Sequence, residues 1–203
     1  MRLDPAATAV LALHWQVNVV RPEGFFGGML AVPVAASGVV DRARAFHEAA
    51  RTAGVRLVFT RFTIPDDEGA LVRNTGFMQA VGDAAEAFRP GAPGAAIVDD
   101  VGFEGGTDEV SDNQRLSGLA GCKLADRLRT DGIDTLLVTG VATNLTVEQT
   151  ARGATDLGFT TYVVSDCVTA APDVVHEASL ANLTLATAGV IGASEGLAAL
   201  VDR

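Results

Sequence analysis

The feature that most constrains the fold is a repeated alternation between short apolar runs and longer segments of helical periodicity. Such runs, uninterrupted by polar residues, are typical of strands that are buried on both faces of a sheet. The predicted strands cover residues 8–14, 55–61, 109–111, 135–140, 160–165 and 188–191. The predicted helices cover residues 39–53, 76–88, 119–129, 144–157, 173–184 and 194–202.

This strand–helix–strand order predicts parallel strands joined by right-handed crossovers, and therefore an α/β sandwich. Two long stretches, 15–38 and 62–108, interrupt the alternation. Long excursions in a compact domain are usually functional loops or oligomer contacts, and we expect the same here. No linker and no internal repeat is visible, so a single domain over residues 1–203 is predicted.

Composition excludes several classes of protein. Of the 203 residues, 48% are hydrophobic and 20% are charged, which excludes a disordered chain. The net charge of -10 argues against a nucleic-acid partner or an anionic membrane surface. No apolar run reaches the roughly 18 residues of a membrane span, and the N-terminus lacks the pattern of a signal peptide. A cytoplasmic location is therefore predicted, with Cys122 and Cys167 as buried thiols rather than a disulfide.

Candidate site residues gather where the predicted strands end. In open α/β sheets, ligands bind at the carboxyl ends of the strands. This places His14, Arg61, the 112–117 segment, the 140–146 turn and Asp166 at the expected crevice. A guanidinium can bind a substrate carboxylate with two hydrogen bonds, but Arg61 has a local aspartate as an equal alternative. For Asp166 we favour a structural role.

The segment 137–154, Leu-Val-Thr-Gly-Val-Ala-Thr-Asn-Leu-Thr-Val-Glu-Gln-Thr-Ala-Arg-Gly-Ala, carries a recognisable pattern. It resembles the signature of the isochorismatase-like (cysteine hydrolase) superfamily, in which a strand and a Thr-Gly-Val-Ala-Thr-Asn turn precede a nucleophilic Cys. Residues 12–16 are similar to the end of that family's first strand. The resemblance covers nearly the whole chain. It implies a Rossmann-like three-layer sandwich with a six-stranded parallel sheet, and a homo-oligomer such as a dimer or tetramer.

The resemblance also implies an altered catalytic triad. The family's Asp, Lys and Cys align with His14, Asn113 and Thr146. Lys123, the chain's single lysine, lies ten positions after Asn113 within a predicted helix and is no substitute. Metal-binding members of the family use carboxylate and His ligands after the second strand, whereas residues 62–68 contain no His. We therefore expect neither a metal nor another cofactor.

Two kinds of chemistry are open to such a site. A Thr hydroxyl needs an adjacent general base, and in this fold His14 would face Thr146 with Asn113 nearby as the orienting group. Alternatively, His14 acts alone as a general acid or base, because an unperturbed imidazole pKa of about 6.5 suits neutral pH. Some members of the superfamily dispense with the Cys and protonate an enol ether through the Asp, a proton transfer that His14 would take over.

The apolar segment 25–30 predicts an aromatic-lined pocket, with a subunit interface as the competing interpretation. Expected substrate-binding residues are Trp15, Gln16, Phe25, Phe26, Arg61, Phe62, Arg115, Val141 and Ala142. Gln16 would orient the ligand, and Arg115 would partly replace the lost cation. The 140–146 turn would present backbone N–H groups to an oxyanion, and in the family the bond before the Ala142 position is often cis. His47 and His176 are predicted to be surface or packing residues away from the crevice.

Two functional hypotheses follow. The first is an enzyme that hydrolyses, eliminates from or rearranges an apolar or aromatic small molecule, centred on His14; a tailoring step in a biosynthetic pathway would suit it. The second is a catalytically inactive relative that binds a ligand or a partner subunit. Loss of turnover in a His14→Ala variant would separate them.

Overall fold

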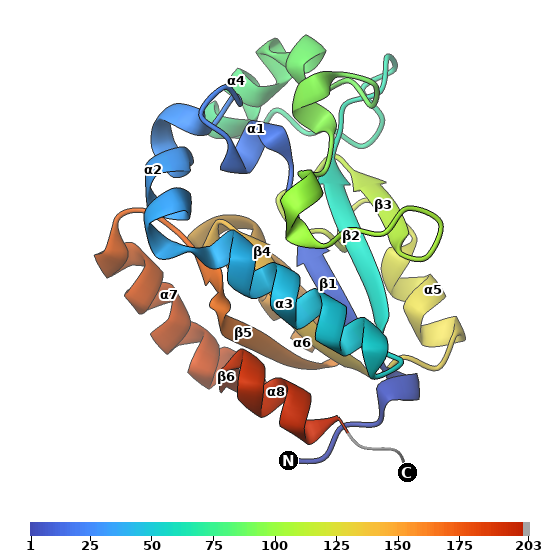
Figure 1. Cartoon of the computed structure of the whole chain (residues 1–203). Helices are drawn as coiled ribbons and strands as arrows, with labels where there is room; N and C mark the ends of the chain where they lie inside the picture. Colours follow the sequence, from blue (N-terminus) through green and yellow to red (C-terminus); the bar gives the residue numbers. More distant parts are fainter. Residues whose placement is uncertain (201–203) are drawn as a thin grey trace.

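The computed structural model describes residues 1–200, and its centre is a six-stranded parallel sheet in the order β3-β2-β1-β4-β5-β6. The strands are β1 Thr8–Leu13, β2 Arg56–Phe62, β3 Glu109–Asn113, β4 Thr135–Val141, β5 Thr160–Thr169 and β6 Gly189–Ile191. Every predicted strand is present, and the α/β fold class is confirmed. All strands run in one direction, so their carboxyl ends share one edge of the sheet, which is the upper edge in Figure 1.

Helices cover both faces of the sheet. On one face lie α3 (Val39–Thr52) and α8 (Ala193–Ala199), whose Phe46 and Ala199 join the same buried cluster. On the other face, α5 (Leu124–Thr130), α6 (Glu148–Asp156) and α7 (Asp173–Ala186) contribute the second cluster. Figure 1 shows α3 and α8 in front of the sheet with α5 and α6 behind it. All six residues of β1 are buried between these layers, as its continuous apolar run predicts.

The remaining helices surround the carboxyl edge of the sheet. They are α1 (Val17–Val20), α2 (Gly27–Ser37) and α4 (Gly76–Asp83), and Figure 1 shows them grouped above the strands. Short 3-10 turns cover Pro5–Ala7, Ala85–Phe88, Pro93–Ala95 and Asp99–Val101. The two stretches that interrupt the alternation therefore build a cap over the strand ends.

Several predicted boundaries are wrong. The stretch 15–38, for which functional loops or oligomer contacts are expected, contains two helices. Periodicity does not reveal α2, because this helix is almost wholly apolar and has no polar face. The helix expected from residue 119 begins only at Leu124. A π-helical turn, Thr143–Val147, opens the helix expected over 144–157. Residues 201–202 of the last predicted helix lie outside the described residues.

A close approach between β1 and β4 shapes the edge where the site lies. Leu13 pairs with Gly140 in the parallel register. A Cβ atom at Gly140 would lie 2.4 Å from the backbone oxygen of Leu13, and the φ of Gly140 is +141°. Only glycine meets both conditions without strain. This glycine therefore allows His14, which follows β1, to lie beside the turn that follows β4.

Candidate functional site

His14 occupies a constrained position at the carboxyl end of the central strand. Its φ is +53°, in the left-handed region that residues other than glycine seldom adopt. Its backbone N–H donates to the carbonyl of Thr60 at 3.1 Å, and its side chain is buried. Strained backbone of this kind clusters at functional sites, which supports a role for this residue.

Asn113, the last residue of β3, holds the His14 ring. The amide nitrogen of Asn113 donates to the backbone oxygens of Arg115 at 2.7 Å and Ser117 at 2.8 Å. Because both amide hydrogens are used in this way, Oδ1 faces the imidazole and accepts a hydrogen bond from Nε2 of His14 at 3.3 Å. The proton of the neutral ring therefore lies on Nε2, and Nδ1 is the nitrogen with a free lone pair.

Burial determines the charge of this histidine. It lowers the pKa of His14 from 6.5 to about 4, and the hydrogen bond to Asn113 offsets this only in part. The expectation of an ordinary imidazole pKa is therefore wrong, because the ring has lost most of its contact with water. At neutral pH His14 is uncharged, so it can accept a proton but cannot serve as a ready proton donor.

Thr146 lies in the π-helical turn and lines the same pocket as His14. Its side chain is buried, and its Oγ1 is one of two buried side-chain polar atoms within residues 1–200 that have no hydrogen-bond partner, the other being Oγ1 of Thr60. No hydrogen bond joins Thr146 to His14, so the hydroxyl is not activated by the imidazole in this arrangement. A buried hydroxyl without a partner is costly, and a ligand in the pocket would satisfy it.

The turn after β4 contributes further to the site. The peptide bond between Val141 and Ala142 is cis, as the resemblance implied, and both residues line the pocket. The hydroxyl of Thr143 is hydrogen-bonded to Nδ1 of His176 on α7 at 2.8 Å. His176 lines neither part of the pocket, and this contact gives it a packing role that ties α7 to the turn.

His47 matches its predicted packing role. It is fully buried, with its Nδ1 donating to the backbone oxygen of Val101 at 2.9 Å. Its Nε2 accepts from the hydroxyl of Thr139 at 2.9 Å, and that hydroxyl accepts in turn from the indole N–H of Trp15 at 3.4 Å. These hydrogen bonds link Trp15, which follows β1, to α3 and β4 inside the core.

Two small adjoining lobes form the pocket at the strand ends. Both lobes are lined by His14, Val19, Phe26, Phe77 and Leu116. The first is completed by Met29, Leu30, Val141, Ala142, Leu145 and Thr146. The second is completed by Phe62, Val81 and Phe88. His14 and Thr146 are the polar residues in this lining, which otherwise consists of aliphatic and aromatic side chains.

Three of the expected substrate-binding residues do not line the pocket. Trp15 points into the core beside His47, at a ring distance of 6.3 Å. Gln16 uses its side-chain amide to bond the backbone N–H and C=O of Phe62, at 2.7 Å and 3.0 Å. Phe25 is 41% exposed and packs edge-on against Phe26 outside the lobes. Because Phe25 is exposed, a subunit contact through residues 25–30 stays a prediction.

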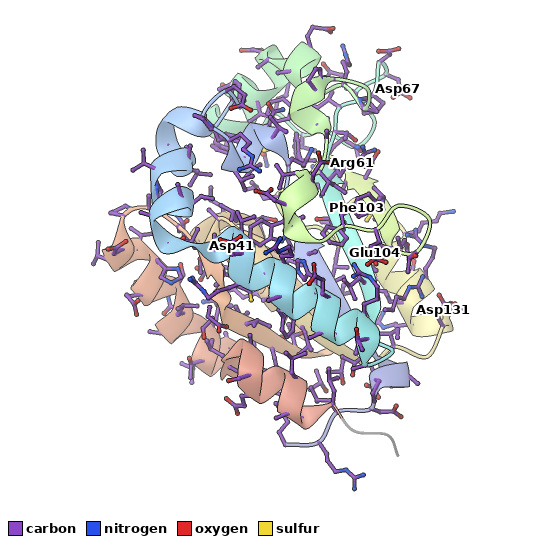
Figure 2. The ribbon with its side chains drawn as sticks, in the orientation of Figure 1. Asp41, Arg61, Asp67, Phe103, Glu104 and Asp131 are labelled. Atoms are coloured by element: carbon purple, nitrogen blue, oxygen red, sulfur yellow. The ribbon has the colours of Figure 1, made fainter. Side chains whose placement is uncertain are left out.

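The two expected arginines are also absent from the lining. Arg61, labelled on β2 in Figure 2, makes two bonds of 2.8 Å to Asp112, its register partner on β3. The local-aspartate alternative is thus the one the structure contains. Arg115 lies beside Gly121, with its Cγ 3.2 Å from where a Cβ atom of that glycine would be. No charged side chain of the described residues faces the pocket.

Sequence reasoning missed Val19, Phe77 and Leu116, which line both lobes. Met29 and Leu30 belong to the apolar segment 25–30, which the sequence analysis assigned to the pocket without naming these two residues as substrate-binding. Phe77 gave a weaker signal as an aromatic residue near the start of a predicted helix. Val19 and Leu116 carry no chemical signature and become visible only in the fold.

The carboxylates after β2 are not arranged for a metal. Glu68 pairs with Arg73 at 2.6 Å, and Asp66 lies 3.7 Å from Arg89. Asp67 lies at the outer edge of the molecule in Figure 2. Within residues 1–200, no three His, Cys, Asp or Glu side chains are grouped so that they could hold a metal ion. Over the same range, no helix combines the length and apolar character needed to cross a bilayer.

Known proteins share this sequence pattern and this fold. Ureidoacrylate amidohydrolase RutB of Methylorubrum extorquens is 30% identical over 193 residues, covering 89% of this chain and 77% of that protein. The uncharacterized isochorismatase family protein YwoC of Bacillus subtilis is 37% identical over 86 residues. That match covers 42% of this chain and 45% of YwoC, so the chain spans less than half the length of this curated relative.

A cysteine hydrolase structure from Pseudomonas syringae superposes with a TM-score of 0.83 at 21% identity, covering 98% of this chain and 94% of that one. At this identity the likeness shows the fold alone. The model of the isochorismatase domain matches residues 8–195. That match takes in all six strands and the entire pocket described above. The chain belongs to the isochorismatase family.

Proposed function

We propose that this protein is a small-molecule enzyme whose chemistry is centred on His14 and uses no cysteine nucleophile. The observation that carries the proposal is the His14–Asn113 pair, in which a buried, uncharged imidazole is held in one tautomer at the meeting point of two apolar lobes. A buried polar pair facing an otherwise apolar cavity is the usual form of a ligand site.

His14 acts in this proposal as the proton acceptor through Nδ1. Asn113 holds Nε2–H and stabilises the imidazolium that forms when Nδ1 takes a proton. A base with a pKa of about 4 suits a reaction that builds negative charge next to the ring, because that charge stabilises the imidazolium. The unpartnered hydroxyl of Thr146 supplies a hydrogen bond to such a developing charge.

This arrangement serves three reaction classes, namely hydrolysis by an activated water, elimination, and rearrangement through abstraction of an acidic C–H proton. Hydrolysis is the first to test, since the Methylorubrum extorquens relative is named an amidohydrolase. The pocket walls favour an apolar or aromatic substrate. Covalent catalysis by Thr146 has less support, because no base contacts its hydroxyl.

The alternative function is a catalytically inactive family member that binds a ligand or a partner subunit. Two observations favour it, namely the low pKa of His14 and the lack of a hydrogen bond between His14 and Thr146. Exposed apolar residues on α2, with Met29 at 48% and Val32 at 79% exposure, support a subunit contact in the same region.

The test is turnover of a panel of amides, esters and β-keto compounds with apolar substituents, followed by mass spectrometry for wild type and for His14→Gln. Thermal unfolding of both proteins controls for loss of the fold. The proposal expects at least one substrate whose turnover falls about 100-fold or more in the variant. Turnover that is equal in both proteins would reject His14 as the base, and no turnover in either would favour the inactive alternative.

A further inference from the structure

The two lobes of the pocket differ in the chemistry of their walls. The first lobe is closed by aliphatic side chains, including Met29, Leu30 and Leu145, together with the hydroxyl of Thr146. The second is closed by Phe62, Phe88 and Val81. Phe62 and Phe88 meet edge to face, with ring centroids 5.5 Å apart. The first lobe is thus shaped for an alkyl group and the second for an aromatic ring.

The boundary between the lobes is formed by residues that line both. Phe26 and Phe77 stack there with centroids 5.5 Å apart and an interplanar angle of 5°. His14 shares this boundary and contacts Phe62 edge to face at 6.2 Å. The polar group of a bound molecule therefore meets His14 at its middle, with apolar parts extending to either side.

None of residues 1–200 offers an ionic ligand in the pocket a countercharge. The guanidinium of Arg61 is paired with Asp112, and the side chain of Arg115 lies against Gly121. Burying a carboxylate or an ammonium group without a partner is strongly unfavourable, whereas His14 and Thr146 can satisfy a single neutral amide or ester by hydrogen bonding. The lining accordingly selects against charged ligands.

We infer that the pocket takes an uncharged molecule with two apolar arms, one aromatic and one alkyl, joined by a single polar linking group beside His14. This inference rests on the proposed function, since it takes the same pocket as the substrate site. It adds the charge, the shape and the orientation of the substrate, with the aryl arm toward Phe88 and the alkyl arm toward Met29.

The test measures binding to the wild-type protein by isothermal titration, with N-benzylbutanamide as the probe. N-benzylacetamide, which lacks two methylenes of the alkyl arm, should bind about 15-fold more weakly. N-methylbutanamide, which lacks the phenyl ring, should bind about 10- to 100-fold more weakly. N-benzylsuccinamate replaces the terminal methyl group by a carboxylate and should bind at least about 100-fold more weakly.

A pair of variants on α2 tests the orientation. Met29→Ala enlarges the alkyl lobe, and because Met29 is half-exposed the change leaves the core intact. Relative to N-benzylbutanamide, the longer N-benzylhexanamide should bind about tenfold more tightly to the variant than to wild type. Val32→Ala, on the same helix but outside the lining, should leave the ratio unchanged.

Each contrary result has a distinct meaning. Binding of N-benzylsuccinamate equal to that of the neutral probe would overturn the uncharged class. Equal affinity for the truncated compounds, no binding of any compound, or an unchanged ratio in Met29→Ala would overturn the two-armed arrangement. Turnover of a substrate outside this class would keep the proposed function and reject the inference. Binding in the expected order without turnover of any substrate would keep the inference and reject catalysis.

Discussion

Replacing Thr146 by valine should make the protein more stable while impairing the site. Thr146 is 2% exposed, and its hydroxyl has no partner. Valine has the same shape, so the change removes an unsatisfied hydroxyl without opening a cavity. An unsatisfied buried donor costs about 1–3 kcal/mol, and in a chain of this size 1 kcal/mol corresponds to about 2–4 °C in Tm. Thr146→Val should therefore raise the Tm by about 3–6 °C.

The matched control is Thr143→Val in the same turn. Thr143 is also fully buried, but its hydroxyl is bonded to His176 at 2.8 Å. Removing that hydroxyl leaves the ring nitrogen of His176 without its partner and should lower the Tm by about 2–6 °C. Differential scanning calorimetry of wild type and the two variants, at one pH and one protein concentration, gives both shifts.

The opposite signs are the core of this prediction. A Thr146→Val variant that is less stable than wild type would show that the hydroxyl makes a stabilising contact. The hydroxyl would then not be an unpartnered group that is available to a ligand. A more stable variant that still turns over a substrate at the wild-type rate would show that the hydroxyl is not needed for chemistry. Stability gained together with activity lost is the expected pair of results.

Three further predictions concern other residues. The free energy of unfolding should fall as the pH drops from 6.5 toward 4, because unfolded histidines gain protons there while His14 and His47, with pKa values lowered to about 4, do not. The free energy of unfolding should fall by about 3 kcal/mol per histidine by pH 4. Urea unfolding at several pH values should show that the free energy of unfolding of a His47→Gln variant depends less steeply on pH than that of wild type. Arg61→Ala should leave ligand affinity unchanged. It should lower the free energy of unfolding by less than about 1 kcal/mol, because the ion pair between Arg61 and Asp112 is partly exposed. A large loss of affinity would show that Arg61 contacts the ligand. Gly140→Ala should lower the free energy of unfolding by more than about 3 kcal/mol, because the added Cβ atom would clash with Leu13. A variant whose Tm is close to that of wild type would contradict this packing.

The sequence was a good guide to the sheet and a partial guide to the site. The continuous apolar run of β1 and the alternation with helices predict a buried parallel sheet without knowledge of any relative. His14, Asn113 and Thr146 come together as expected, since each lies at or just after the carboxyl end of a parallel strand.

Side-chain direction was harder to predict. The left-handed φ of His14 turns the chain, so that Trp15 enters the core instead of the pocket. The pairing of Arg61 with Asp112 follows from the register between β2 and β3, which periodicity alone does not supply. The pKa of His14 depends on its burial and on its hydrogen bond to Asn113, a residue distant from it in sequence. Such features depend on long-range packing and are not visible in local patterns.

The proposed chemistry requires His14 to be an uncharged base with its proton on Nε2 and its Nδ1 open to a ligand. The most direct measurement is a long-range ¹H–¹⁵N spectrum of protein labelled in its histidine rings, recorded from pH 8 to pH 5 and assigned with the His14→Gln variant. We expect an Nε2–H tautomer for His14 that stays uncharged throughout this range. A ring that is charged at pH 7, or that carries its proton on Nδ1, would show that His14 is not an uncharged base with Nδ1 open to a ligand.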